Sequence, residues 1–239
     1  MFRLVLVLIG IVPATIYTGF RMLWVVYRKS PSSPCVCHSA PQQWARFILR
    51  CSGVKIVLEN AEAIDPNRPQ ILVANHESWF DVLAILAQTP GRTIFVAKKE
   101  LERIPIFGSA VAACGHIFID REDRGRAVDS LSVARKRLEE ESPTVIMFPE
   151  GTRSATGEMR PFKKGAFVLA IQTGVDIVPA AICGSRAVMR KGSLLIRPGT
   201  VLVRFGEPIS VQGLTLDARN DLSDRAREAL TGLRAAAAR

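Results

Sequence analysis

The stretch that decides the fold runs from residue 70 to residue 88 and reads QILVANHESWFDVLAILAQ. Ile71–Ala74 is a short, uninterrupted apolar run, which is typical of a buried β-strand. A polar segment follows, and Ser78 is then well suited to cap a helix over residues 78–88. This stretch therefore predicts a strand, a polar loop and a helix in immediate succession.

The same alternation continues on both sides of this stretch. We predict strands at Val54–Leu58, Ile71–Ala74, Thr93–Ala97, Ile117–Ile119, Thr144–Phe148, Ile177–Ile182, Leu194–Ile196 and Val201–Phe205. We predict helices at 78–88, 100–113, 125–141 and 164–173, and from Asp217 onward. Strands that alternate with helices are typical of a layered α/β domain. The sequence therefore predicts a single α/β domain with a mixed, largely parallel central sheet.

Composition excludes several other classes of protein. A chain of 239 residues that is 48% hydrophobic can bury a core, so it is not disordered. The net charge is +10, and residues 1–50 hold six basic side chains and no acidic one. These cations are interleaved with Leu, Val and Ile, which favours an anionic membrane surface over nucleic acid as the partner.

An apolar run of 17 residues, Leu4–Phe20, lies near the start and continues past Arg21 to Tyr27. Seventeen helical residues reach ~26 Å, slightly less than a ~30 Å hydrocarbon core. The longer stretch would span the core, but it buries Arg21 unless that side chain snorkels. A signal peptide is the alternative, yet no convincing cleavage site follows the run. We therefore expect a retained anchor that either spans the bilayer or lies in one leaflet.

A second, amphipathic segment follows a Ser/Pro-rich turn at residues 30–34. In residues 42–51, Trp44, Phe47, Ile48 and Cys51 share one helical stripe. The stripe fits an interfacial helix in the headgroup region and, equally, a helix that packs on the domain. The neighbouring anchor favours the interfacial interpretation.

The chain has five cysteines, which are Cys35, Cys37, Cys51, Cys114 and Cys183. An odd, irregularly spaced set does not resemble a disulfide framework. Cys35, Cys37 and His38 lie too close together, and without a second pair, to form a structural zinc site. We expect reduced thiols, as on a cytosolic face.

Polar clusters follow three of the predicted strands, and the first contains His76 and Asp81. A histidine held at one ring nitrogen by a carboxylate can act as a general base through the other. Neither a G-x-S-x-G elbow nor a nearby cysteine supplies a nucleophile. The pattern favours a histidine that activates a hydroxyl of the substrate, although a lone histidine at a strand end is often structural.

The other two clusters bring arginines to strand ends. Phe148–Ser154 reads FPEGTRS and contains Arg153, a side chain suited to hold a phosphate by two parallel hydrogen bonds. A turn with a surface ion pair is the simpler interpretation of this loop. Gly115–Arg121 brings another arginine, and alone it indicates little.

Together these clusters resemble the sequence blocks of a known family. The blocks N-H-x-S-x-x-D, G-x-x-F-I-x-R, F-P-E-G-T-R-S and V-P-x-x-I occur in order at residues 75–81, 115–121, 148–154 and 178–182. Ala97–Leu101 and Ile104–Gly108 are also similar to the family. The chain resembles the bacterial 1-acylglycerol-3-phosphate O-acyltransferases (lysophosphatidic acid acyltransferases, PlsC-like) of the glycerolipid acyltransferase superfamily.

The resemblance implies acyl transfer without an acyl-enzyme. His76, oriented by Asp81, would take the proton of the acceptor hydroxyl, which then attacks an acyl thioester. The donor would be acyl-CoA or acyl carrier protein, and neither a cofactor nor a metal is implied. The acceptor would be lysophosphatidic acid, with another lyso-lipid such as lyso-ornithine lipid as the alternative.

The resemblance also assigns the binding residues. Glu150, Gly151 and Arg153 would bind the acceptor, and Arg121 and Lys98 would join the phosphate contact. Lys99 is the alternative to Lys98. A phosphomonoester that carries nearly two negative charges needs more than one cation, which agrees with this assignment.

Family members carry a two-helix N-terminal element in one leaflet, which suits residues 3–28 and 41–52. We therefore expect a membrane anchor at 1–52 and a catalytic domain at 53–239, on the cytoplasmic face of the inner membrane. Two other functions are weighed against this one. A lipid-binding protein with a decayed site would not keep His76 and Asp81, and a thioesterase would not need both arginine blocks.

Overall fold

The computed structural model describes residues 2–120, 124–141 and 143–237, with side chains from residue 9 onward and, in the second range, from residue 129. Its centre is a seven-stranded sheet in the order β1-β7-β6-β2-β5-β3-β4. Only β6 and β7 pair antiparallel, so the mixed, largely parallel sheet is confirmed. The strands are β1 (Val54–Glu59), β2 (Gln70–Ala74), β3 (Thr93–Lys98), β4 (Ile117–Ile119), β5 (Thr144–Met147), β6 (Ile177–Cys183) and β7 (Gly199–Phe205).

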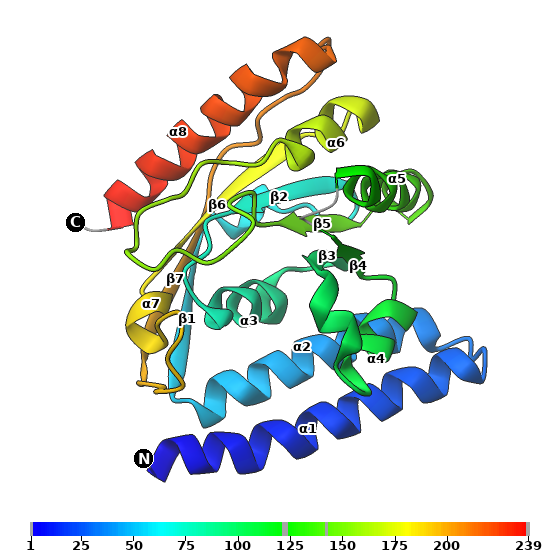
Figure 1. Ribbon diagram of the computed structural model, residues 1–239, viewed down its shortest axis with the longest axis vertical. Helices are drawn as coiled ribbons and strands as arrows, with labels where there is room; N and C mark the ends of the chain where they lie inside the picture. The colour runs from blue at the N-terminus through cyan, green and yellow to red at the C-terminus, as the bar shows by residue number, and fades with distance from the viewer. Residues whose placement is uncertain (1, 121–123, 142, 238–239) are drawn as a thin grey trace.

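Helices cover both faces of the sheet (Figure 1). On one face lies α3 (Trp79–Gln88), and on the other lie α5 (Arg124–Glu141), α6 (Gly165–Thr173) and α8 (Arg219–Ala237). Side chains alternate along β2, so Leu72 belongs to the core on the α3 side and Ile71 to the core on the α6 side. All five residues of β2 are buried, as an uninterrupted apolar run predicts.

Two predicted elements differ from the structure. The predicted helix 100–113 is two pieces, a 3₁₀ turn η2 (Lys99–Arg103) and helix α4 (Phe107–Ala113). Pro105 and the positive φ of Ile106, 66°, interrupt the helix between them. The predicted strand Leu194–Ile196 is wrong, because this segment is irregular and Leu194 is 71% exposed instead of paired in the sheet. The short elements that complete the chain are η1 (Ala61–Ala63), α7 (Ser185–Val188) and η3 (Leu216–Ala218).

Two long N-terminal helices form a further layer below α3 (Figure 1). Helix α1 (Phe2–Tyr27) is outermost, and α2 (Ser33–Cys51) lies between it and α3. Helix α2 starts well before the predicted residue 42. Its predicted stripe divides, since Ile48 is 2% exposed and packs into the core whereas Phe47 is 43% exposed. The packing interpretation is therefore confirmed for Ile48, and the interfacial interpretation stays a prediction.

The outer face of α1 is apolar and exposed. The span from Ile9 to Tyr27 is long and apolar enough to cross a membrane. Its mean hydropathy is 1.4, and only 11% of it is buried inside the protein. Arg21 is not directed only toward this apolar face. Its guanidinium donates to the Gln43 side chain of α2 at 3.1 Å. The exposed large apolar side chains are Ile9, Val12, Ile16, Tyr17, Phe20, Trp24 and Tyr27.

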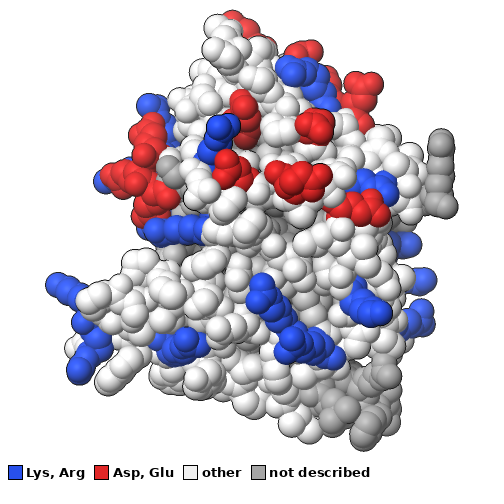
Figure 2. All heavy atoms as spheres, turned by 180° about the vertical axis from the view of Figure 1, so that it is seen from behind, with Lys and Arg blue, Asp and Glu red and all other residues white. Residues whose placement is uncertain are grey.

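Charge is divided between the two sides of the molecule. Figure 2 shows Asp and Glu gathered in the upper half of the rear face, together with Lys and Arg. The lower half, where α1 and α2 lie, shows Lys and Arg without acidic residues. The apolar face of α1 is therefore accompanied by positive charge, as contact with an anionic bilayer requires.

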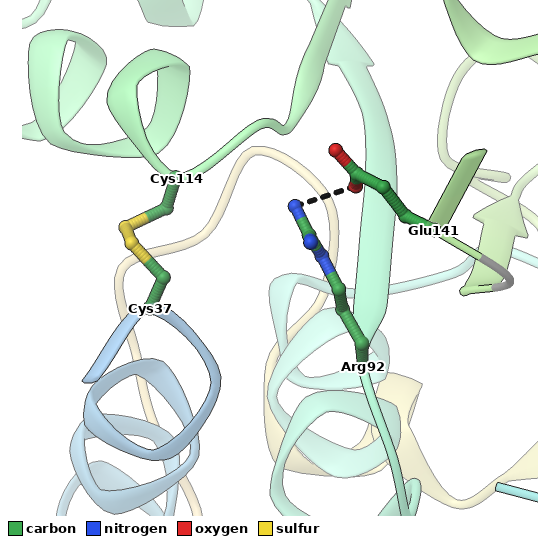
Figure 3. The surroundings of a disulfide bond; sticks show 4 residues. All are labelled: Cys37, Arg92, Cys114 and Glu141. Carbon is green, nitrogen blue, oxygen red and sulfur yellow. Dashed lines mark ion pairs between the residues drawn. A yellow bond between two sulfur atoms is a disulfide. The ribbon is translucent and has the colours of Figure 1, made fainter. Parts of the chain in front are cut away.

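A disulfide joins Cys37 of α2 to Cys114, which follows α4 (Figure 3). The expectation that all cysteines are reduced is therefore wrong for these two, while Cys35, Cys51 and Cys183 are free thiols. The paired cysteines are 77 residues apart, and the packing of α1, α2 and α4 brings them together. Cysteine spacing in the sequence carries no signal of that packing.

His116 lies two residues after Cys114 and is half-buried near a charged network. The backbone N–H of Phe95 donates to His116 Nδ1 at 3.0 Å, so this nitrogen carries no proton. Burial, reinforced by Arg92 and Arg137, lowers the pKa of His116 from 6.5 to about 4. Both arginines also pair with Glu141, at 2.6 and 3.2 Å (the Arg92 pair is drawn in Figure 3).

This lowered pKa predicts a loss of stability in mild acid. The unfolded chain takes up the proton below pH 6.5 and the folded chain only near pH 4, so the stabilising contribution is lost as pH falls between them. From pH 7.5 to 5 the His116 contribution should fall by about 2 kcal/mol. Urea unfolding of wild type and His116→Gln, whose amide oxygen can still accept from Phe95, measures the difference. Equal acid losses in both proteins would refute this role.

Candidate active site

His76 and Asp81 meet where β2 ends and α3 begins. Ser78 caps α3, and Asp81 in the first turn completes a capping box with it. Asp81 Oδ2 accepts from the backbone N–H of Glu77 at 2.6 Å and of Ser78 at 2.8 Å, and lies 2.9 Å from His76 Nδ1. One carboxylate oxygen therefore orders the loop and orients the histidine ring.

The geometry of His76 suits a general base. A carboxylate oxygen only accepts, so the proton of the neutral ring lies on Nδ1 and the lone pair on Nε2. The ring also stacks on Phe148 at 4.2 Å between centroids and 23° between planes. The Asp81 side chain is fully buried, whereas that of His76 keeps 14% of its surface exposed. The ring is therefore fixed and still open to a substrate.

Asn75 ties this loop to the neighbouring strand. Its Nδ2 donates to the carbonyl of Ile182 at 2.9 Å, and its Oδ1 accepts from the N–H of Ile182 at 2.7 Å. Ile182 belongs to β6, which pairs with β2. The first and fourth sequence blocks therefore meet through paired hydrogen bonds.

Glu150 joins the His76 loop to the loop that follows β5. Its Oε1 accepts from the N–H of His76 at 2.7 Å, and its Oε2 accepts from the N–H of Arg160 at 2.9 Å. Burial raises the pKa of the Glu150 carboxyl, and these two hydrogen bonds oppose that effect. The carbonyl of His76 also accepts from Ser154 N–H at 2.7 Å. The structure thus gives Glu150 a scaffolding role, and its predicted contact with the acceptor stays a prediction.

Gly151 and Arg153 lie in the same loop. Gly151 has a φ of 71°, and a Cβ on it would come within 3.0 Å of Lys163 Cε, so larger residues are disfavoured here. The guanidinium of Arg153 lies 4.8 Å from the ring centroid of Trp79, the residue after the α3 cap. Burial lowers the pKa of Arg153, and the nearby charge of Asp81 opposes that effect. Arg153 is therefore a cation held beside the His76–Asp81 pair.

The other predicted phosphate ligands are not brought to His76 by any described contact. Lys98 ends β3, and its Nζ lies 2.5 Å from Glu100. Lys99 pairs with Glu102 at 2.5 Å. Arg121 lies outside the described residues. Strands β2, β5, β3 and β4 are parallel, so the segments that follow them share one edge of the sheet. The phosphate roles of Lys98 and Arg121 remain predictions.

A set of cations that was not predicted from the sequence holds the loop at residues 153–160. Four side chains beyond residue 183 donate to backbone carbonyls of this loop, and the sequence shows only a charged C-terminal helix. The seven-residue spacing of Arg227 and Arg234, which places both on one helix face, was the available signal. The donors and carbonyls are Lys191 to Arg153 at 2.9 Å, Arg186 to Ala155 at 2.9 Å, Arg234 to Gly157 at 2.8 Å, and Arg227 to Met159 at 3.2 Å and Arg160 at 3.3 Å.

Arg234 also reaches the residue next to His76. It pairs with Glu77 at 2.6 Å, and the Glu77 side chain is only 8% exposed. Burial raises the pKa of the Glu77 carboxyl, and Arg234 opposes that effect. Helix α8 therefore braces both active-site loops, one through Glu77 and one through Gly157.

We expect Arg234→Gln to lower both stability and turnover. Breaking a buried ion pair costs about 3–5 kcal/mol, because it leaves the other charge unpaired. Loosened loops should lower kcat about tenfold. Thermal unfolding and initial rates check this, with Arg225→Gln as the control on an exposed position of the same helix. The double variant Glu77→Gln/Arg234→Gln should recover part of the lost stability. Additive losses would contradict the pairing.

Within the described ranges, His, Cys, Asp and Glu side chains form no group of three that could hold a metal ion. The site as described is built from a histidine–carboxylate pair and arginines.

The chain is similar to known acyltransferases. The family model described as Acyltransferase matches residues 55–183, a range that includes all four sequence blocks and leaves out the N-terminal helices and the C-terminal part. The human 1-acyl-sn-glycerol-3-phosphate acyltransferase alpha is 36% identical over 178 residues, which are 74% of this chain and 63% of that protein. The 1-acyl-sn-glycerol-3-phosphate acyltransferase of Saccharomyces cerevisiae is 34% identical over 177 residues, 73% of this chain and 57% of that protein. The chain thus spans less than two thirds of these relatives.

A solved structure matches over nearly the full length. The crystal structure of the 1-acyl-sn-glycerophosphate (LPA) acyltransferase PlsC from Thermotoga maritima superposes with a TM-score of 0.83 at 29% identity. The match covers 99% of this chain and 97% of that one, so it includes α1 and α2. The family model covers more than half of the chain, and the buried histidine–aspartate pair lies within that match. On this evidence the chain belongs to the Acyltransferase family.

Proposed function

We propose that this protein transfers an acyl chain from an acyl thioester to the free hydroxyl of 1-acylglycerol-3-phosphate, giving phosphatidic acid. The observation that carries the proposal is the His76–Asp81 pair, in which a buried carboxylate leaves Nε2 as the basic nitrogen. The printed names of the human and yeast relatives and of the Thermotoga structure support this acceptor.

The proposed mechanism has no acyl-enzyme. His76 Nε2 takes the proton of the acceptor hydroxyl while that oxygen attacks the thioester carbonyl carbon. The tetrahedral intermediate collapses, the carbon–sulfur bond breaks, and the thiolate takes the proton back from His76. Asp81 stabilises the imidazolium that exists between the two proton transfers. Acyl-CoA and acyl carrier protein both supply the required thioester, and the proposed mechanism uses no cofactor.

The acceptor phosphate is proposed to lie against Arg153, with Gly151 allowing close approach and Glu150 holding the loop. Arg121 and Lys98 are proposed as further cations for this phosphate. The anchoring of Arg153 on Trp79 supports the assignment, because the stacked guanidinium keeps its donor edges free for an anion.

We propose that α1 and α2 hold the protein on the inner membrane. The exposed apolar face of α1 supports this placement, as does a groove of about 260 Å³ between the two helices, lined by Tyr17, Arg21, Trp44 and Phe47 among others. The Cys37–Cys114 disulfide removes the argument from reduced thiols for a cytoplasmic orientation. That orientation therefore rests on the donors, because CoA and carrier protein thioesters are used in the cytoplasm.

Acyl transfer by the purified full-length protein in detergent micelles tests the proposal. One acyl-CoA is offered with lysophosphatidate and, in parallel, with lyso-ornithine lipid. We expect phosphatidate from wild type only, with His76→Ala as the background. Product from lyso-ornithine lipid alone would overturn the acceptor and keep the chemistry. If both acceptors fail with acyl-CoA and also with acyl carrier protein, the proposed function is wrong.

Removing the Arg153 side chain should affect one substrate more than the other. We expect Arg153→Ala to raise KM for lysophosphatidate by about 10- to 100-fold, the value of a charge-assisted hydrogen bond. KM for the acyl donor should change little. Arg153→Lys keeps the positive charge but loses the two parallel donors of the guanidinium. Its KM for lysophosphatidate should therefore lie between the values of wild type and Arg153→Ala. Equal shifts in the two KM values would exclude the phosphate contact.

A further inference from the structure

The loop between α7 and β7 is ordered and carries exposed leucines. We call residues 189–198 the Leu194 loop. Its base is closed by the N–H of Arg197 donating to the carbonyl of Val188 at 2.9 Å. A turn bond from Ser193 N–H to the Arg190 carbonyl, at 3.1 Å, shapes the tip. Leu194 is 71% and Leu195 48% exposed. The two side chains therefore point outward from a defined conformation.

Cations flank these leucines on both sides. Arg190 and Lys191 precede the tip, Arg197 follows it, and the loop contains no Asp or Glu. All three cationic residues are exposed. Exposed apolar side chains between cations fit an anionic bilayer, since the leucines can enter the acyl region while the cations meet lipid phosphates.

The Leu194 loop connects the active site with the membrane helices. At its start, the carbonyl of Met189 accepts from Ser78 Oγ at 2.8 Å, and Lys191 donates to the Arg153 carbonyl. At its end, Gly199 pairs with Val54 next to the C-terminus of α2. That end of α2 packs against α1, as the proximity of Phe47 to Gly10 shows. Figure 1 shows the loop at the end of the molecule where α2 ends and α1 begins.

We propose that the Leu194 loop is a second membrane contact, which inserts Leu194 and Leu195 into an anionic lipid surface and holds the mouth of the active site there. The loop lies at the same end of the molecule as the start of α1 (Figure 1), and its positive charge is complementary to an anionic lipid surface. It rests on the proposed function for its purpose, but its existence can be measured without activity. An acidic protein partner is the competing occupant.

Tryptophan fluorescence with brominated lipids tests the insertion. Full-length Leu194→Trp is mixed with vesicles of phosphatidylcholine and phosphatidylglycerol, with and without bromine on the acyl chains. We expect quenching beyond that of wild type, whose own tryptophans give the background. Leu216→Trp is the matched control, because Leu216 is an exposed leucine (43%) in the turn that precedes α8, the helix that covers the other face of the sheet from α3. Quenching at 194 no greater than at 216 would overturn the proposal.

Vesicle flotation separates the two parts of the contact. We expect Leu194→Ser/Leu195→Ser to weaken binding about tenfold, both on vesicles with phosphatidylglycerol and on vesicles without it. Arg190→Gln/Arg197→Gln should weaken it only when phosphatidylglycerol is present. Binding unchanged in both variants would refute the contact. Capture of carrier protein that depends on the leucines, with no quenching by lipids, would assign the loop to a protein partner instead. If the wild-type protein shows no acyl transfer, the proposed function is wrong, but these binding results still stand.

Discussion

Replacing His76 with alanine is expected to lower kcat by about 10²–10⁴, the range of general-base catalysis, with little change in stability. The reason is that the ring alone supplies the basic Nε2. Apart from the ring's hydrogen bond to Asp81, the bonds of this residue are made by its backbone, whose N–H donates to Glu150 and whose carbonyl accepts from Ser154. Alanine keeps both bonds. Initial rates of acyl transfer in micelles, together with thermal unfolding, measure the two effects.

The control for His76→Ala is a measurement that shows whether the variant keeps the wild-type fold. Near-ultraviolet circular dichroism should match wild type, because the loop bonds through Asp81 Oδ2 to Glu77 and Ser78 do not need the ring. Retained activity in a folded His76→Ala protein would eliminate the general-base assignment. Loss of activity with loss of folding would show that stacking on Phe148 holds the loop.

The second large effect is expected for Asp81→Asn. Asparagine has the same shape and can still accept from one or two of the loop N–H groups, but it cannot stabilise an imidazolium by charge. We expect kcat to fall about 10²- to 10⁴-fold. Weaker capping of α3 should cost a further 0.5–2 kcal/mol or so of stability. Rates and urea unfolding check the two losses separately.

A double variant decides whether the pair acts as one unit. In the His76→Ala background, Asp81→Asn should lower the rate little further, because the group that Asp81 orients is gone. The stability loss caused by Asp81→Asn should persist in this background. It comes from weaker hydrogen bonds between residue 81 and the N–H groups of Glu77 and Ser78, and these bonds do not involve the histidine ring. Rate losses that multiply in the double variant would show that Asp81 acts independently of His76.

The core of the site could be predicted from the sequence because its contacts are local. Ser78, Asp81 and the loop between them interact within five residues, so strand, polar loop and capped helix follow from residue order and side-chain chemistry. The uninterrupted apolar run of β2 likewise predicts a strand buried on both faces. The four ordered blocks indicated the family for the same reason, since each is a short local pattern.

Errors arose where a segment depends on distant partners. The Leu194–Ile196 run has strand-like composition, but a strand forms only beside another strand, and this run is exposed. The break at Ile106 occurs where α4 packs on α1, through the close approach of Gly19. Helix α2 extends upstream past Pro41 because its buried face packs between α1 and α3.

By itself, the sequence determined the alternation of strands and helices, the His76–Asp81 pair and the basic, apolar N-terminus. Each of these is encoded by neighbours in the chain, through apolar periodicity, capping and charge. Tertiary structure alone decided that Glu150 holds His76 from 74 residues away, that Cys37 meets Cys114, and that α8 braces the site through Arg234. These contacts join segments that are far apart in the sequence and that only the folded sheet and its helix layers bring together. Local sequence patterns therefore do not predict them.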